Sequence, residues 1–306
     1  MTPSSESEVN RVSDGPETPA ASGHGAPVVS RFAPSPTGWL HMGHAASAIR
    51  AHDFVRARNG RFLLRIEDID HGRTRPEYVT GILTDMAWLG LEPDDPPLMQ
   101  SARADAHMAA LERLIDTGLL FPCVCTRKDI AAAHGAPHPG EHIPYPGTCR
   151  DLSGPARAAA LAGPHAWRLD ARRAAERVGQ LHFHDNGERI DVDPLKLGDA
   201  VIARKDVGPG YHLAVTVDDA FQGVTDVVRG LDLLDATHLH RVLQTMLGLP
   251  APRYHHHPLI LDNEGRRLAK RDGVQSLAEL RASGWTAADV RAALDMPGLE
   301  ATVRMG

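Results

Sequence analysis

The chain has 306 residues, of which 42% are hydrophobic, and a formal net charge of −6. This length can bury a full core in one or two domains, and no apolar run approaches the ~20 residues that a membrane helix needs. An acidic balance is not the usual footprint of tight, charge-driven nucleic-acid binding, although one face can still be basic. Three cysteines, two of them in a Cys-x-Cys pair, argue against a disulfide framework and predict a reducing cytoplasm.

The first 27 residues are rich in Ser, Pro, Glu and Gly. They lack the basic and apolar regions of a signal peptide. We therefore expect residues 1–27 to form a disordered tail, with the folded part starting near Val28.

The stretch Arg31–Ala45 predicts a strand, a loop rich in Pro and Gly, and the start of a helix. The first free N–H groups of such a helix and the positive end of its dipole favour an anion. His41 and His44 flank this position, and imidazoles donate hydrogen bonds to phosphate oxygens. Many α/β proteins contain a strand, a glycine loop and a helix, so this pattern alone is weak evidence for a nucleotide site.

The next elements continue an α/β alternation. Arg61–Glu67 reads as a buried parallel strand, and helices are expected at Pro76–Leu89 and Arg103–Thr117. The carboxylates Glu67, Asp68 and Asp70 lie at the C-terminal end of the strand, where ligands bind in open α/β sheets. A solvated acidic turn is the alternative interpretation of these carboxylates.

A third region, from about Leu120 to Asp193, breaks this alternation. Short strands are expected at Ala166–Leu169 and Gln180–His184. Three thiols from two segments can bind zinc if a fourth ligand is supplied, or they can be buried as small hydrophobic groups. The thiols belong to Cys123, Cys125 and Cys149, and the histidines of the intervening loop that could supply the fourth ligand are His134, His138 and His142.

Beyond this region we expect strands at Val201–Ala203 and Leu213–Val217, the second within a buried run that ends in two carboxylates. A helix is expected at Ala236–Gly248. Three consecutive histidines, 255–257, follow it, but neighbouring side chains on an extended segment point in alternate directions, so a single ion cannot easily use all three. Two short helices are expected at the end of the chain, at Ser276–Ala282 and Ala287–Leu294.

Several blocks together resemble the class I aminoacyl-tRNA synthetases of the glutamyl/glutaminyl group. Their His-Ile-Gly-His motif is similar to His41–His44, preceded here by Ala-Pro-Ser-Pro-Thr-Gly. Further similarity lies in Arg-Ile-Glu-Asp-Ile-Asp, in Tyr211 with the Asp-Asp pair that follows it, and in Arg229-Gly230. Arg267–Arg271 resembles the Lys-Met-Ser-Lys-Ser loop, with Lys270 at the second lysine and an alanine in place of the first serine. The resemblance runs from about Val28 to Gly273.

The resemblance implies a doubly wound parallel, Rossmann-like α/β catalytic domain with a zinc-bearing insert and a short helical C-terminal piece. The expected units are the tail (1–27), two catalytic halves (28–119 and 194–250), the insert (120–193), and a phosphate-clamp loop with short helices (251–306) that has no residues left for an anticodon-binding domain.

The resemblance also assigns site residues. Catalysis is assigned to His41, His44 and Lys270, and ATP binding to these three together with Gly43. Glutamate binding is assigned to Arg31, Phe32, Ala33, Pro34, Ser35, Glu67, Tyr211 and Arg229. The ligands of one structural zinc ion are assigned to Cys123, Cys125, Tyr145 and Cys149, and Mg²⁺ is expected to accompany ATP.

Within this family the pattern is similar to short members that activate L-glutamate with ATP, without tRNA, and then transfer it to the queuosine base in the anticodon of tRNA(Asp). A cytoplasmic monomer without membrane contact is expected. Two alternatives stay open: a truncated glutamyl-tRNA synthetase that charges the 3′ end of tRNA, and a non-catalytic paralogue that binds nucleotide or RNA.

Overall fold

The computed structural model describes residues 27–132, 145–260 and 275–295. Its first half alternates strands with helices. The strands β1 (Val29–Phe32), β2 (Arg61–Ile66) and β3 (Leu98–Met99) run parallel, and they are linked by the helices α1 (Met42–Arg56) and α2 (Pro76–Trp88). α1 begins where the loop after β1 ends, and Pro76 opens α2 because its missing N–H is not needed in a first turn.

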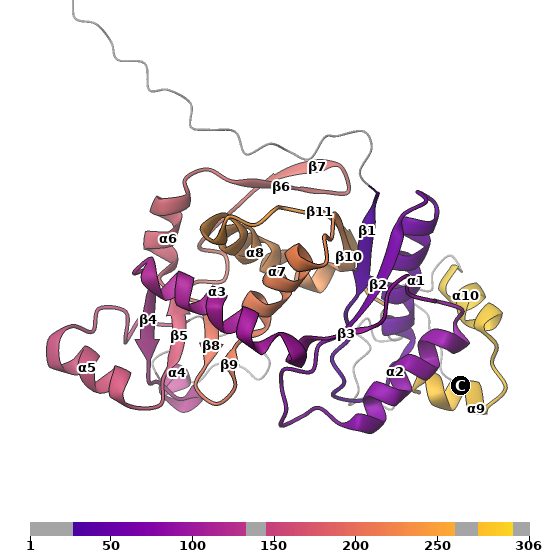
Figure 1. Ribbon diagram of the computed structural model, residues 1–306, viewed down its shortest axis with the longest axis horizontal. Coiled ribbons are helices and arrows are strands. Elements are labelled where there is room, and N and C mark those ends of the chain that lie inside the picture. The colour runs from indigo at the N-terminus through magenta and orange to yellow at the C-terminus, as the bar shows by residue number, and fades with distance from the viewer. Residues whose placement is uncertain (1–26, 133–144, 261–274, 296–306) are drawn as a thin grey trace, which may run out of the picture.

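The second half of the parallel layer starts at β10 (Asp226–Gly230), which pairs with β11 (Arg253–His257). β10 lies beside β1, where Thr225 N donates to the carbonyl of Val29 at 3.0 Å. From this junction the chain runs outward to β2 and β3 on one side and to β11 on the other (Figure 1). The reversal of strand order between β1 and β10 is a topological switch point, where open α/β sheets bind ligands.

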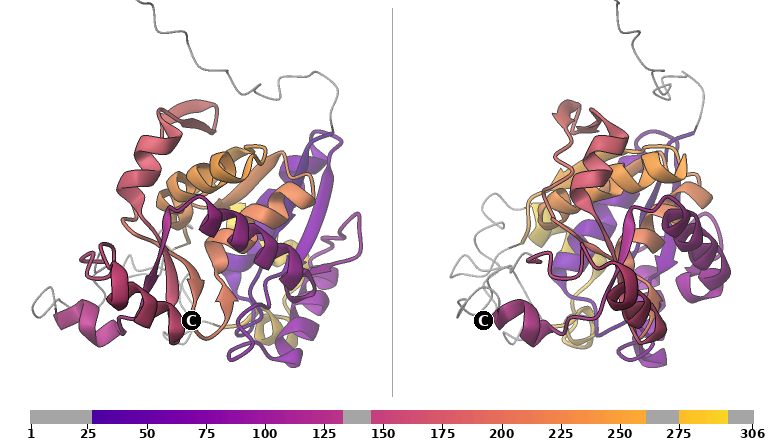
Figure 2. Two further views of the ribbon diagram at one scale, coloured as in Figure 1. Left: turned by 60° about the vertical axis from the view of Figure 1, so that its left-hand side comes forward. Right: turned by 90° about the vertical axis from the view of Figure 1, so that its left-hand side faces the viewer.

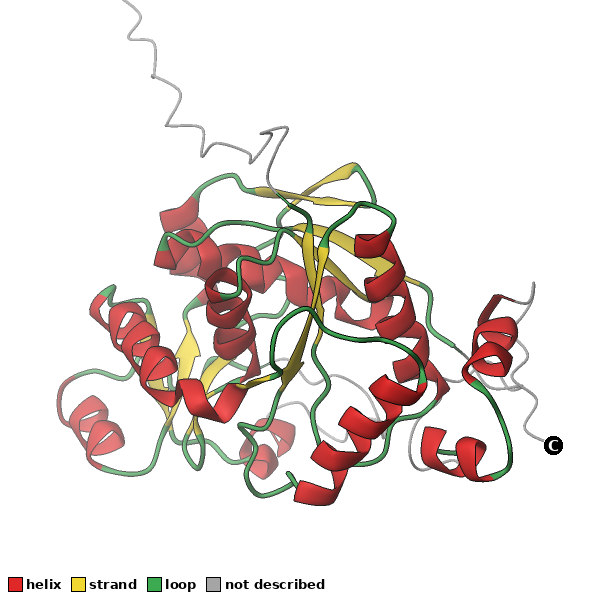
Figure 3. Cartoon of the chain, turned by 45° about the vertical axis from the view of Figure 1, so that its right-hand side comes forward, coloured by secondary structure: helices red, strands yellow, loops and turns green. Residues whose placement is uncertain are grey.

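Helices cover both faces of this layer (Figure 3). α1 and α2 pack in one apolar cluster with β1 and β2, while α8 (Leu234–Leu247) packs in a second cluster with α3 (Ala104–Asp116) and α7 (Tyr211–Phe221). Right-handed crossovers that leave a switch point in opposite directions place their helices on opposite faces, which accounts for the two clusters. The doubly wound fold is confirmed.

One expected element is wrong. The run Leu213–Val217 is not a strand but the core of α7, a helix whose residues 213–216 and both following carboxylates are buried. A short apolar run that is buried on every side carries no periodicity, so it cannot be assigned to strand or helix from sequence alone.

An antiparallel sheet separates the two halves in sequence. Its strands are β4 (Leu120–Cys123), β5 (Ala166–Leu169), β8 (Val201–Arg204) and β9 (Gly208–Pro209). The helices in this part of the chain are α4 (Arg127–Ala132), α5 (Gly154–Ala162) and α6 (Ala171–Val178), whereas the short helix η1 (Gln100–Arg103) lies earlier, between β3 and α3. The hairpin of β6 (His182–Asp185) and β7 (Glu188–Asp191) instead joins the edge of the parallel layer, because β6 pairs with β11. The boundaries of the expected units stay a prediction.

A short helix, η2 (Leu231–Leu233), links β10 to α8. The last described elements, which follow β11, are α9 (Leu277–Ala282) and α10 (Ala287–Asp295). Arg281 ties α9 to Asp85 of α2 at 2.6 Å, and Arg291 ties α10 to Asp53 of α1. These helices and the antiparallel sheet lie at opposite ends of the molecule, with the parallel strands between them (Figure 1), so that in the right-hand view of Figure 2 the sheet lies in front and α9 and α10 lie behind. Across the described segments, none of the helices combines the length and the apolar character needed to cross a membrane. The expected tail lies outside the described residues.

Candidate active site

A cavity of about 280 Å³ opens at the switch point between β1 and β10. We call it the switch-point cavity. Its wall is formed by the loop after β1, the first turn of α1, and the carboxyl ends of β2, β10 and β11. The structure brings into this wall all the described residues expected to bind ATP or glutamate: Arg31, Phe32, Ala33, Pro34, Ser35, His41, Gly43, His44, Glu67, Tyr211 and Arg229. Lys270 lies outside the described residues.

The two histidines of the loop cap the N-terminus of α1 by reciprocal hydrogen bonds. Gly43 N donates to Nδ1 of His41 at 3.1 Å, and His41 N donates to Nδ1 of His44 at 3.2 Å. Because each Nδ1 accepts, each neutral ring carries its proton on Nε2. A side chain at Gly43 would meet the His41 ring at about 3.1 Å, so the ring would have to shift by a few tenths of an ångström to admit one. The helix N-terminus and two imidazoles thus face one cavity, which suits a phosphate.

Buried charges surround the inner end of the cavity. Arg31 forms a bidentate ion pair with Asp219, in which Nε donates to Oδ1 at 2.8 Å and Nη2 donates to Oδ2 at 3.2 Å. Arg65, fully buried in β2, reaches Asp219 at 2.8 Å and Glu67 at 3.3 Å. Arg229 adds a third guanidinium group from β10. Three guanidinium groups therefore lie beside two carboxylates at this end, and a further carboxylate, Asp232, lines the wall of the same cavity.

Glu67 is the less well compensated of the two carboxylates. Burial raises its pKa, and the attraction of Arg65 and Arg31 does not cancel that effect. Asp219 behaves in the opposite way: burial pushes its pKa up, but Arg31 and Arg65 outweigh it and hold the pKa below its usual range. Glu67 is thus the carboxylate that would gain most from an added cation such as an ammonium group.

The two adjacent aspartates of α7 face different networks. Asp218 accepts from Arg103 at 2.7 Å and Gln100 at 2.9 Å and lies 3.0 Å from His107 of α3. Of the Asp-Asp pair, only Asp219 contacts the arginines at the inner end of the cavity. Asp218 instead binds α7 to α3, which is a packing role.

The consecutive histidines of β11 also separate, as expected for a strand. His255 lies 2.9 Å from Asp226, His256 accepts from Arg229 Nε at 3.1 Å, and His257 lies 3.0 Å from Ser47 Oγ in the cavity wall. Sequence reasoning did not single out His256 or Arg65 as site residues. An arginine inside an apolar strand was the available signal for Arg65, because buried arginines need partners.

A second cavity of about 290 Å³ shares part of its wall with the first, namely Ser35, Thr37, Glu67 and Tyr211. Its far side carries Asp70, which accepts from Arg73 at 2.8 Å and from Arg204 of β8 at 3.2 Å. The two cavities therefore meet at Glu67 and Tyr211.

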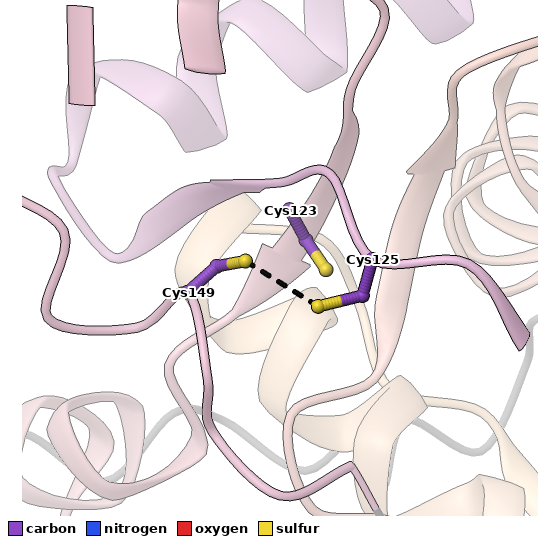
Figure 4. A group of neighbouring side chains, drawn as sticks. All are labelled: Cys123, Cys125 and Cys149. Atoms are coloured by element: carbon purple, nitrogen blue, oxygen red, sulfur yellow. Dashed lines mark hydrogen bonds between the residues drawn. The ribbon is translucent and has the colours of Figure 1, made fainter. Parts of the chain in front are cut away.

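The cysteines converge at the end of β4, as the sequence suggested. Their three sulfurs lie within 4.8 Å of one another, with Cys125 and Cys149 3.5 Å apart (Figure 4). The hydroxyl of Tyr145 lies 3.4 Å from the sulfur of Cys123 and accepts from Cys149 N at 2.8 Å. Tetrahedral zinc with Zn–S bonds of ~2.3 Å holds its sulfurs ~3.8 Å apart, so the donor set fits one ion. The three loop histidines lie outside the described residues.

Comparison with known proteins gives a consistent result. Residues 27–301 match the model of the class I tRNA synthetases (E and Q), catalytic domain. The chain is 48% identical over 274 residues to the glutamyl-Q tRNA(Asp) synthetase of Rhodobacter capsulatus, covering 86% of this chain and 98% of that protein. It is 47% identical to the protein of that name from Nocardia farcinica, covering 86% of this chain and 82% of the relative.

Among solved structures, a glutamate tRNA ligase from Elizabethkingia meningosepticum, in complex with its amino acid, matches with a TM-score of 0.67 and 28% identity. The glutamate-tRNA synthetase of Elizabethkingia anophelis matches with the same TM-score and 29% identity. Each match covers 81% of this chain but 53% of the solved one, so the chain spans about half the length of these structures.

Proposed function

Because the chain belongs to the class I tRNA synthetases of the glutamate and glutamine group, we propose that it activates L-glutamate with ATP and transfers it to the queuosine base in the anticodon of tRNA(Asp). The observation that carries the first step is the charge at the inner end of the switch-point cavity. Its wall carries two guanidinium groups, Arg31 and Arg229, which match the two carboxylates of glutamate, and the carboxylate of Glu67, which matches the ammonium group; glutamine would leave one guanidinium group without a carboxylate.

In this proposal Glu67 receives the α-ammonium group, while Arg31 and Arg229 lie about the carboxylates of the substrate. The α-carboxylate of glutamate attacks the α-phosphorus of ATP, which gives glutamyl-adenylate and pyrophosphate. His41 and His44, with the N-terminus of α1, stabilise charge on the phosphates, and Lys270 is proposed to join them. Loss of one such contact typically costs on the order of 3 kcal/mol of barrier.

The second step places the acceptor hydroxyl beside the adenylate. The hydroxyl attacks the activated carbonyl, its proton leaves, and AMP is released. The second cavity meets the first at Glu67 and Tyr211, so an acceptor ring held there would approach the activated carbonyl. Unstacked RNA bases can be splayed into such a pocket and contacted there directly.

Two ions are part of the proposal. Mg²⁺ is proposed to enter with ATP and to supply charge neutralisation on its phosphates. Zinc is proposed to bind Cys123, Cys125, Tyr145 and Cys149 as a structural ion, since this cluster lies at the end of β4 and none of its residues lines the switch-point cavity.

The activation step is tested by exchange of labelled pyrophosphate into ATP with no tRNA present. Glutamate is expected to support exchange and glutamine is not. Arg229→Ala should weaken glutamate binding by roughly 2–5 kcal/mol, because a substrate carboxylate would be buried without its partner. Arg189→Ala, an exposed arginine on β7, is the matched control. Equal exchange with glutamine would refute the assignment of the arginines.

The transfer step is tested with labelled glutamate and tRNA from cells that make queuosine and from cells that lack it. Only the first pool should be labelled, and the label should survive removal of the terminal adenosine. Equal labelling of both pools, with loss of the label on that digestion, would favour charging of the 3′ end. No exchange and no transfer would favour a non-catalytic binder.

A further inference from the structure

Arg229 is held in an unusual way for a buried arginine. Among the described residues, all of its hydrogen-bond partners are neutral groups. Nε donates to Nε2 of His256 at 3.1 Å, and Nη1 lies 3.4 Å from Nδ1 of His240. Nη2 donates to Oγ1 of Thr237 at 2.7 Å and to the carbonyl of Leu233 at 3.1 Å. The guanidinium is thus fixed on three of its nitrogens with no carboxylate in contact.

The other two arginines of the cavity region differ in this respect. Arg31 and Arg65 both bind Asp219, and Arg65 also reaches Glu67. Within the part of the chain that the structure describes, no carboxylate oxygen lies within 4 Å of Arg229. Of these three guanidinium groups, Arg229 is therefore the one whose charge is not offset by a carboxylate in contact with it.

The arrangement requires particular tautomers of two histidines. Nδ1 of His256 lies 3.0 Å from Oδ1 of Asp185, so Nδ1 carries the proton and Nε2 offers a lone pair to Arg229. Nε2 of His240 lies 3.1 Å from Nδ1 of His212, so that Nε2 donates and Nδ1 accepts from Arg229. A protonated ring at either position would present an N–H to the guanidinium and repel it.

The surroundings keep both rings neutral. Burial and the charge of Arg229 lower the pKa of His256 to about 4, although Asp185 acts in the opposite direction. His240 is fully buried and faces Arg229, His212, Arg31 and His256, so its pKa lies well below the usual value. At neutral pH both imidazoles are acceptors for Arg229.

We propose that His256 and His240 are positioning residues that hold Arg229 through neutral acceptors and thereby leave its charge available to a carboxylate of the substrate. This rests on the proposed binding of glutamate by Arg229. A carboxylate in place of either histidine would hold the guanidinium equally well but would cancel its charge. Neutral support therefore contributes to the choice of glutamate over glutamine.

The test compares His256→Gln with His256→Glu in pyrophosphate exchange. Both substituted side chains offer an oxygen acceptor to Arg229 Nε, but only the Glu side chain at position 256 adds a negative charge. His256→Glu should raise KM for glutamate roughly thirtyfold or more and reduce the preference over glutamine, with KM for ATP within about twofold. His256→Gln should keep KM for glutamate within about threefold. His255→Gln, on the opposite face of β11 beside Asp226, is the control.

Equal effects of the two substitutions, or an unchanged KM for glutamate in His256→Glu, would overturn the proposal. A purely structural role would lower the melting temperature and kcat in both variants without a selective change in KM for glutamate. Because His256→Glu can fail to fold, ¹⁵N shifts of the histidine rings in the wild-type protein give an independent readout. They should show Nδ1–H at His256 and Nε2–H at His240, and the reverse tautomers would refute the idea even if the protein activates another amino acid.

Discussion

Asp219 is the residue on which the buried charges of the cavity depend, and its replacement by asparagine gives a quantitative test. Its two oxygens accept three hydrogen bonds, two from Arg31 and one from Arg65, at 2.8, 3.2 and 2.8 Å. In Asp219→Asn the charge is lost and an amide N–H group faces the guanidinium groups. Removing one partner of a buried ion pair costs about 3–5 kcal/mol, because a charge is left buried without compensation. We expect that loss of unfolding free energy.

The loss is measured by urea unfolding at pH 7, with the midpoint falling and the slope unchanged. Asp191→Asn is the matched control, since Asp191 pairs with Arg189 at 3.3 Å on the surface, where such pairs contribute about 0–1 kcal/mol.

The pH dependence gives a second check on Asp219. A carboxyl group whose pKa is lower in the folded protein stabilises the fold above its unfolded pKa, and this contribution fades as the pH falls through the folded value. The difference in stability between wild type and Asp219→Asn should therefore be constant above about pH 5 and shrink below about pH 4. A loss under about 1 kcal/mol at pH 7, equal to that of the control, would refute the reasoning.

Three further predictions follow from the described contacts. Gly60→Ala should lower the free energy of unfolding by about 1–3 kcal/mol in urea, because the added carbon would lie 2.3 Å from the carbonyl oxygen of Val28. Gly163→Ala is the control and should not lower it, because the nearest atom to its added carbon is 3.8 Å away. Cys149→Ala should lower zinc content in elemental analysis and the melting temperature before it alters glutamate specificity, and purified wild type without zinc would contradict this. Burial pushes the pKa of Asp226 up, but His255 and Arg253 outweigh it and hold the pKa far below its usual range. The charged carboxylate should therefore stabilise the fold at pH 7 and less in strong acid, so the stabilities of wild type and Asp226→Asn should differ less at pH 2 than at pH 7. A stability difference that does not change with pH would contradict this prediction.

The sequence determined those parts of the protein that depend on local order. The strand, loop and helix of residues 28–56 follow from proline, glycine and the apolar spacing, and the structure has β1, the loop and α1 at those positions. The helices α2, α3 and α8 begin and end within two residues of the expected bounds, since their apolar faces repeat at helical spacing. The convergence of the three cysteines was also predicted.

Tertiary structure decided the parts in which the partners are far apart in the chain. Nothing local marks α7 as a helix, because its residues are buried by α3, α8 and the antiparallel sheet. Arg31 and Asp219 are 188 residues apart, and His256 and Asp185 are 71 apart. The sequence predicted which side chains have charge or hydrogen-bonding capacity in the site. Whether an arginine is paired with a carboxylate, as Arg31 is, or with neutral histidines, as Arg229 is, depends on which strands become neighbours at the switch point, and that depends on packing of the whole sheet.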